Sequence, residues 1–159
     1  MPEFLNSSFG LKLTAAQAVQ EIVRFMRTEP LFRYKVTIGT DSQRLSDTRA
    51  DFVTAVVVHR VGNGGRYFWR RIELGNLHTL RDRILREVVL SLEIATGVVK
   101  ELQQYSLPEF DFEIHIDVGE NGPTKVMLQE VVGMVRAYNF EAKTKPDSYA
   151  ASSVADHLV

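Results

Sequence analysis

The sequence predicts a mixed α/β domain whose five-stranded mixed sheet has the order 3-2-1-4-5, with helices on both faces and an extra N-terminal helix. Three observations support this fold class. A β-branched run, a glycine-rich turn and a returning apolar run indicate an antiparallel hairpin in the first half. Two strand–helix segments follow in the second half, where crossovers make neighbouring strands parallel. A capped amphipathic segment precedes all of these strands and accounts for the extra helix.

Composition limits the class of protein. A chain of 159 residues with a net charge of −1 and no cysteine is long enough for one domain, and it excludes a disulfide framework and thiol chemistry. We expect residues 1–12 to be a loose lead-in and residues 13–159 to form the single domain. No leader pattern or membrane-length apolar run is present, so we expect a cytoplasmic protein with no membrane partner.

The first half of the chain supplies a helix and three strands. Thr14-Ala-Ala-Gln17 predicts a capping box that opens the helix, and Pro30 ends it. The three strands follow from apolar and β-branched runs, and the last two are joined by the turn Val61-Gly-Asn-Gly-Gly65. The predicted strands are Tyr34–Ile38, which continues to Asp41, then Phe52–Val58 and Tyr67–Ile72.

The second half alternates between helix and strand. A long helix is predicted from about Leu80 to Tyr105 by a broad apolar arc with a period of 3.6 residues. Phe110–Asp117 alternates strictly and reads as a strand, after which Gly122-Pro123 is expected to open the next helix. A short strand, Phe140–Lys145, and a last helix, Ser148–Leu158, complete the predicted order.

Two aspartates meet at one edge of this predicted sheet. Strand 1 ends at Asp41 and lies beside the parallel strand 4, which ends at Asp117. Two adjacent carboxylates repel, and a divalent cation is the simplest remedy. Helical phase puts Glu87 at the margin of the apolar arc of the long helix, where it faces the sheet as a candidate third ligand. The alternative is that Glu87 only pairs with Arg83 four residues earlier.

A fourth acid is expected from the last helix, where two aspartates compete. Asp147 follows Pro146 and is well placed as an N-cap. Asp156 lies within the helix among alanines, which would allow a close approach to the sheet. We favour Asp156 and keep Asp147 as the alternative.

Three motifs in this order carry a family resemblance. Gly39-Thr-Asp-Ser-Gln43, His115-Ile-Asp-Val-Gly119 and the segment Lys145–Asp156 together resemble the ribonuclease H-like YkuK family of bacterial proteins. The similarity runs from the first helix onward. It implies a two-metal phosphodiesterase fold, in which Asp41, Glu87, Asp117 and Asp156 occupy the four acidic positions of the superfamily.

The resemblance also implies a chemistry for these acids. Two Mg²⁺ or Mn²⁺ ions would be bridged by Asp41 and shared with Glu87, Asp117 and Asp156. One ion would lower the pKa of an attacking water and the other would stabilise the leaving oxygen. Carboxylate oxygens suit these hard cations better than they suit Zn²⁺.

Nucleic acid is the expected partner, through a local basic flank. Arg70 and Arg83 belong to a group of arginines around the hairpin and the start of the long helix, and Lys125 follows a glycine loop. The full group is Arg60, Arg66, Arg70, Arg71, Arg81, Arg83 and Arg86. The aromatic run 67–69 either stacks on bases or turns Tyr67 and Trp69 into the core.

Two functions remain open on the sequence. The first is a divalent-metal-dependent nuclease that acts on DNA or RNA. The second is a non-catalytic module on the same fold that binds nucleic acid or protein, since a fold alone does not establish catalysis. His115 is expected to be either a support for Asp117 or a core histidine.

Overall fold

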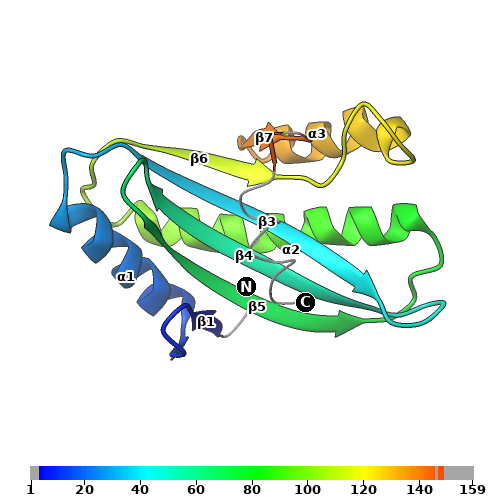
Figure 1. Cartoon of the computed structure of the whole chain (residues 1–159), viewed down its shortest axis with the longest axis horizontal. Helices are drawn as coiled ribbons and strands as arrows, with labels where there is room; N and C mark the ends of the chain where they lie inside the picture. The colour runs from blue at the N-terminus through cyan, green and yellow to red at the C-terminus, as the bar shows by residue number, and fades with distance from the viewer. Residues whose placement is uncertain (1–3, 146, 149–159) are drawn as a thin grey trace.

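The computed structural model describes residues 4–145, 147 and 148. These residues form a mixed seven-stranded sheet with the helices α1 (Ala15–Thr28), α2 (Leu80–Leu102) and α3 (Leu128–Ala137) (Figure 1). The strands, in spatial order, are β2 (Lys12–Leu13), β1 (Leu5–Ser7), β5 (Gly65–Leu74), β4 (Ala50–Arg60), β3 (Tyr34–Arg44), β6 (Phe110–His115) and β7 (Glu141–Lys143).

The predicted order of the five central strands is confirmed. β3, β4 and β5 pair antiparallel, whereas β3 pairs parallel to β6 and β6 parallel to β7. The predicted total of five strands is wrong. Residues 1–12, which were expected to be a loose lead-in, contain β1, the turn after it and the first residue of β2. β1 pairs with β5 through Asn6 and Ser7, and Leu5 is buried in the core. A three-residue strand is too short to show an alternating pattern in the sequence.

Capping boxes open two of the helices, and the one at Thr14 is as predicted. The Thr14 side chain accepts a hydrogen bond from the Gln17 backbone N–H, and the Gln17 side chain accepts one from the Thr14 backbone N–H. Thr79 and Asp82 form the same reciprocal capping box at the start of α2. These bonds satisfy N–H groups that have no partner within the helix.

The region after β6 differs in detail from the prediction. Gly122-Pro123 does not open a helix: Gly122 has a φ of 84°, and a 3-10 turn, Lys125–Met127, comes before α3. β6 ends at His115 rather than at Asp117, and β7 covers three residues rather than Phe140–Lys145. The predicted helix Ser148–Leu158 lies outside the described residues except for Ser148.

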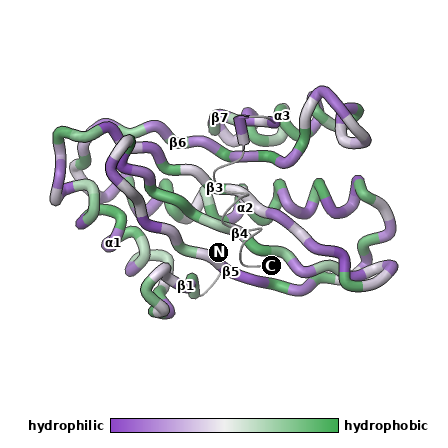
Figure 2. Tube along the Cα trace, in the orientation of Figure 1, coloured by the Kyte–Doolittle hydropathy of each residue, from purple (hydrophilic) through white to green (hydrophobic). Residues whose placement is uncertain are grey.

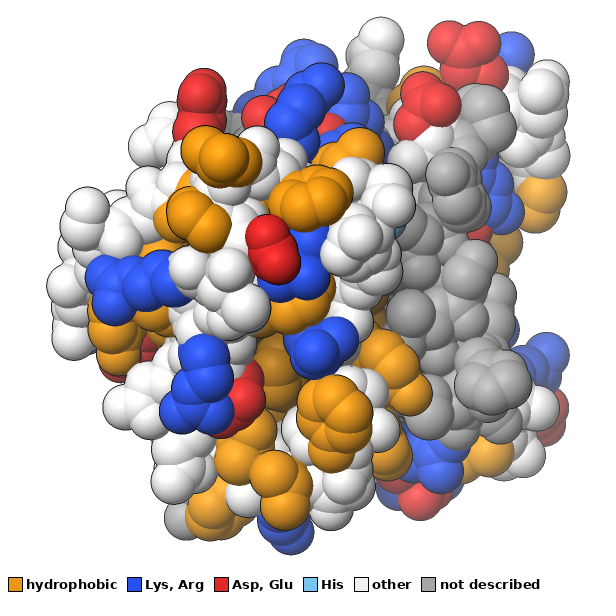
Figure 3. Space-filling view, turned by 60° about the vertical axis from the view of Figure 1, so that its left-hand side comes forward, with side chains coloured by type: hydrophobic (Ala, Val, Ile, Leu, Met, Phe, Trp, Pro, Cys, Tyr) orange, Lys and Arg blue, Asp and Glu red, His pale blue; other side chains and the backbone are white. Residues whose placement is uncertain are grey.

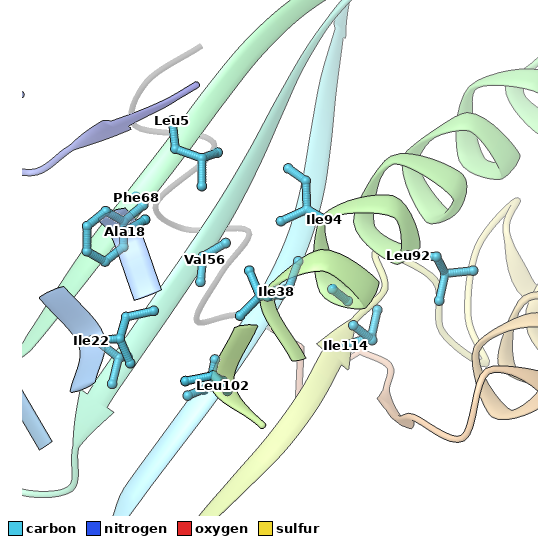
Figure 4. Packing of buried hydrophobic residues seen from close by; sticks show 14 of the residues in the cluster. Leu5, Ala18, Ile22, Ile38, Val56, Phe68, Leu92, Ile94, Leu102 and Ile114 are labelled. Atoms are coloured by element: carbon cyan, nitrogen blue, oxygen red, sulfur yellow. The ribbon is translucent and has the colours of Figure 1, made fainter. Parts of the chain in front are cut away.

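The main core lies between one face of the sheet and the helices α1 and α2. Figure 4 shows Ile22 of α1 and Ile94 and Leu102 of α2 directed toward strand residues that include Ile38 and Val56. Hydrophobic and hydrophilic positions alternate along α1 in Figure 2, as a half-buried helix requires. In the described part of the chain, no helix is long and apolar enough to cross a membrane.

Candidate functional site

The parallel pairing of β3 with β6 brings the two predicted aspartates to one edge of the sheet. The last paired residues are Gly39 and His115, and Asp41 and Asp117 each follow two residues later. Asp41 also pairs with Val53 of β4. Asp117 lies just beyond the end of β6, where the chain leaves the sheet.

Helix α2 places Glu87 against this edge. The side chain is buried, at 5% exposure, although it carries a carboxyl group. Nearby, Thr40 bonds both Thr54 and Ser91 through buried hydroxyls at 2.8 and 2.7 Å, and these contacts join α2 to β3 and β4. The helical phase predicted that Glu87 faces the sheet, and the structure has it there.

Ser42 connects Glu87 to Arg83. The Ser42 hydroxyl donates a hydrogen bond of 2.6 Å to Glu87 Oε2. Arg83 donates from Nε and Nη2 to the same hydroxyl at 3.2 and 3.1 Å, and from Nη2 to the Ser42 carbonyl at 3.1 Å. The predicted facing of Glu87 toward the sheet is confirmed, its role as a metal ligand stays a prediction, and its contact with Arg83 runs through the Ser42 hydroxyl.

The electrostatics of Glu87 are unusual. Burial raises the pKa of Glu87 to about 8, and the nearby negative charge of Asp117 acts in the same direction. The hydrogen bond from Ser42 and the positive charges of Arg83 and Lys145 oppose this rise in pKa. Glu87 and Asp117 therefore lie close enough to repel each other.

Lys145 is a neighbour that the sequence reasoning gave no role. Its Nζ lies 2.8 Å from Asp117 Oδ1, and its backbone N–H donates to the Val118 carbonyl at 2.8 Å. Its position in the third motif, before Pro146, was the available signal. Ser42 was also missed as a link, although it directly follows Asp41 in the first motif.

The structure does not bring Asp41 to Glu87. Thr40 and Ser42 point toward α2, as their hydrogen bonds show. Successive side chains of a strand point to opposite faces, so Asp41 points to the other face of the sheet. Among residues 4–145, 147 and 148, no three acidic or histidine side chains are grouped to hold a metal ion. Asp156 lies outside the described residues, so the four-carboxylate site stays a prediction.

The donor chemistry of the described residues nevertheless suits a hard divalent cation. Glu87 and Asp117 offer carboxylate oxygens, which Mg²⁺ and Mn²⁺ prefer. Burial and the charge of Asp117 raise the pKa of Glu87 even though the positive charges of Arg83 and Lys145 oppose the rise. A cation bound to this pair would supply further positive charge.

The alternative fourth ligand, Asp147, is exposed, and its backbone N–H donates to the Thr144 carbonyl at 2.8 Å. His115 lies buried on the same face of β6 as Glu113, with Nε2 3.4 Å from Glu113 Oε1. Burial lowers the pKa of His115, and the bond to Glu113 opposes this. His115 is thus a partnered core histidine, whereas its support of Asp117 stays a prediction.

Most of the predicted basic flank is engaged in structural contacts. Arg60 donates to the Tyr34 hydroxyl and the Phe25 carbonyl, Arg71 pairs with Asp51, and Arg81 forms a two-bond ion pair with Glu130. On the side of the molecule seen in Figure 3, Lys and Arg side chains are scattered among hydrophobic and acidic ones. The arginines therefore do not form one continuous basic surface there.

The three predicted substrate-binding residues differ in their surroundings. Arg70 is half-buried, and burial lowers its pKa while the negative charge of Glu93 opposes this. Arg83 lies beside Glu87, and Lys125 is exposed in the 3-10 turn. Within the aromatic run 67–69, Phe68 is buried in the core and its two neighbours are half-buried. The interpretation that turned Tyr67 and Trp69 into the core is therefore wrong by one residue.

Comparisons with known proteins cover most of the chain. A family profile described as Ribonuclease H-like matches residues 17–159. The chain is 33% identical over 158 residues to "Uncharacterized protein YkuK" of Bacillus subtilis (strain 168), with 92% of this chain and 91% of that protein covered. No solved structure matches the chain.

Proposed function

The chain belongs to the ribonuclease H-like family, and from this premise we propose that it is a divalent-metal-dependent nuclease or related phosphodiesterase. The observation that carries the proposal is the buried Glu87 carboxyl beside Asp117, at the edge where β3 and β6 end. Burying an acid is costly without a partner of opposite charge, and a fold seldom retains such a group without a use. Nucleic acid is the substrate class that the family suggests.

Each acid has a defined part in this proposal. Glu87, Asp117 and Asp156 would hold Mg²⁺ or Mn²⁺, and Asp41, whose side chain points to the other face of the sheet, is left out of this set. Such ions, when bound, activate water and stabilise the charge that develops on phosphate oxygens. Glu87 would ionise once a cation is present, because positive charge favours the carboxylate.

Neighbouring residues would orient these acids and the substrate. Ser42 fixes the rotamer of Glu87 through its hydroxyl bond, and Arg83 fixes Ser42 from the other side. Arg83 also brings a guanidinium close to Glu87, where it would contact a substrate phosphate. Arg70 and Lys125 are the further candidates for phosphate contacts, and the exposed position of Lys125 favours it over the half-buried Arg70.

The test is hydrolysis of labelled single- and double-stranded DNA, RNA and DNA–RNA hybrid by the purified protein with Mg²⁺ or Mn²⁺. We expect Glu87→Gln and Asp117→Asn to abolish hydrolysis. Asp111→Asn is the matched control, because Asp111 lies on β6, the strand that Asp117 follows, but is exposed and makes only a weak pair with Arg33 at 4.0 Å. Hydrolysis that survives both site substitutions would disprove the assignment of the site.

One observation favours the second candidate, a non-catalytic module that binds nucleic acid or protein. The Lys145 ammonium already neutralises Asp117 across 2.8 Å, as a structural ion pair would. In that case the protein would bind no divalent cation at this edge. Binding of Mn²⁺ that is lost in Glu87→Gln would separate the enzyme from the module.

A further inference from the structure

A small cavity lies next to the candidate site, between the β3–β4 connection and the start of α2. Its volume is about 150 Å³. Three of the residues that line it are arginines, and the complete lining is Arg44, Ser46, Asp47, Arg49, Leu77, His78, Thr79, Leu80 and Arg83. Except for Arg83, no residue of this set was singled out by the sequence.

Backbone hydrogen bonds fix the walls of this cavity. The N–H groups of Leu45 and Ser46 both donate to the Arg49 carbonyl, at 2.9 and 3.2 Å, and close the β3–β4 connection. The Leu77 N–H donates to the Thr48 carbonyl at 2.9 Å and ties this connection to the segment before α2. A site whose walls are already held in place loses little entropy when it binds a ligand.

The lining has an excess of positive charge. Three guanidinium groups face one carboxylate, that of Asp47, which pairs with Arg44 at 2.8 Å. Arg49 pairs outside the lining, with Glu73 at 2.8 Å through Nε. The first turn of α2 also borders the cavity, and its N-terminus is capped by the Asp82 carboxylate.

Each arginine also has N–H donors beyond those used in these contacts. Within the described part of the chain, no hydrogen bond involves Nη1 of Arg44, Nη1 of Arg83 or either Nη of Arg49. Guanidinium groups with free planar N–H donors bind the oxygens of phosphate in pairs. The cavity is smaller than the roughly 300 Å³ at which small-molecule sites begin, so it suits a single phosphate group rather than a whole nucleotide.

Arg83 connects the cavity to the candidate site, because it lines the cavity and also bonds Ser42, the partner of Glu87. We propose that this arginine cavity binds a phosphate group of the nucleic-acid strand, one that neighbours the phosphodiester held at Glu87 and Asp117. The identity of the strand rests on the proposed function. The phosphate chemistry rests on the cavity alone.

The test uses the double variant Arg44→Gln/Arg49→Gln, whose residues are exposed and whose partners are exposed acids. The control is Arg24→Gln/Arg33→Gln, which removes two exposed arginines from surface pairs with acids outside the cavity. Binding of a fluorescent single-stranded oligonucleotide is followed by anisotropy in EDTA, so that no hydrolysis occurs. Thermal unfolding of both variants verifies that each is folded.

We expect the cavity variant to weaken oligonucleotide binding by about 10-fold or more, the loss of one to two good charged contacts. The slope of log affinity against log salt should fall by about 0.7, the value for one neutralised phosphate on a single strand. The control should bind within about twofold of the parent, with an unchanged slope. Equal weakening in both variants, or none in either, would overturn the proposal.

Two further arms identify the source of the phosphate. Inorganic phosphate should compete with the oligonucleotide on the parent protein and lose this effect on the cavity variant. If only 5′-phosphorylated oligonucleotides respond to the substitutions, the cavity takes a terminal phosphate, and its proposed internal position is wrong. If the cavity variant loses binding and the parent shows no hydrolysis, the phosphate site in the cavity is supported and the nuclease proposal is disproved. If the parent hydrolyses nucleic acid and the cavity variant binds normally, the nuclease proposal is supported and the phosphate site is disproved.

Discussion

Ser42 on β3 donates a hydrogen bond of 2.6 Å to Glu87 on α2, and this contact joins the central strand to the helix that covers it. It is the only hydrogen bond made by the Glu87 carboxyl among the described residues. The serine also accepts from Arg83, so one hydroxyl mediates between a buried acid and a guanidinium.

Glu87→Gln should remove a pH dependence of stability. The folded pKa of about 8 lies above the ordinary value of 4.5, so the folded protein binds a proton that the unfolded chain releases between these values. The free energy of unfolding of the parent should therefore fall as the pH rises from about 4.5 to about 8, by up to about 1.4 kcal/mol per pH unit from this group. The variant should lack this contribution.

Chemical denaturation in EDTA at several pH values measures the difference between parent and variant. The gap in unfolding free energy, variant minus parent, should grow with pH and level off above about pH 8. Glu120→Gln, at an exposed position, is the control and should give no such trend. A gap that is independent of pH would contradict the raised pKa.

Ser42→Ala should destabilise the fold. The substitution leaves a buried acid without its hydrogen-bond donor and deprives Arg83 of an acceptor, which costs about 1–3 kcal/mol. Ser46→Ala, at an exposed position in the β3–β4 connection, is the control and should change the unfolding free energy by less than about 0.5 kcal/mol. Urea denaturation compares Ser42→Ala with Ser46→Ala. Equal effects would show that the hydrogen bonds of Ser42 do not contribute to the free energy of unfolding.

Thr40→Val should also destabilise the fold, because it removes the central hydroxyl of three that are hydrogen-bonded to one another. Thr40 bonds Thr54 and Ser91, and all three side chains are buried. Valine keeps the shape but leaves two hydroxyls without this partner, at a cost of about 1–3 kcal/mol. The triple variant Thr40→Val/Thr54→Val/Ser91→Ala should recover part of that loss, because no polar group is then stranded. A triple variant less stable than the sum of the three single changes would refute this account.

Mn²⁺ should stabilise the parent protein against heat. At 100 times the dissociation constant, an ion that binds only the folded state adds about 2.7 kcal/mol, which corresponds to roughly 5–10 °C in melting temperature for a domain of this size. The effect should vanish in Glu87→Gln and persist in Asp111→Asn. Equal shifts in all three proteins would place the ion elsewhere.

The sequence was sufficient for elements with long, periodic patterns. Thr14 and its capping box located α1, and the phase of α2 showed that Glu87 faces the sheet. β1 was missed because three residues carry too little pattern. The prediction that Gly122-Pro123 opens a helix was wrong, because Gly122 adopts a positive φ and makes a turn. The helix α3 begins only at Leu128.

The partners of charged side chains were harder to predict, for a physical reason. Arg81 bonds Glu130 and Arg83 bonds Ser42, and both partners come from distant parts of the chain. Periodicity reports only which face a residue occupies, not which distant group will lie opposite it. The arginines therefore looked like one basic flank in sequence, although the fold assigns most of them to separate partners.

The parallel pairing of β3 with β6 also bears on how the protein folds. β4, β5 and α2 all lie between Gly39 and His115 in the sequence, so this pair closes a long loop of the chain (Figure 1). Closing so long a loop is entropically costly, and contacts between distant residues slow the folding of a domain. The β3–β4–β5 meander can assemble from neighbouring segments, whereas the edge that holds Asp117 beside Glu87 must wait for the crossover. A nascent or truncated chain that stops before β6 would thus carry Glu87 without its acidic neighbour.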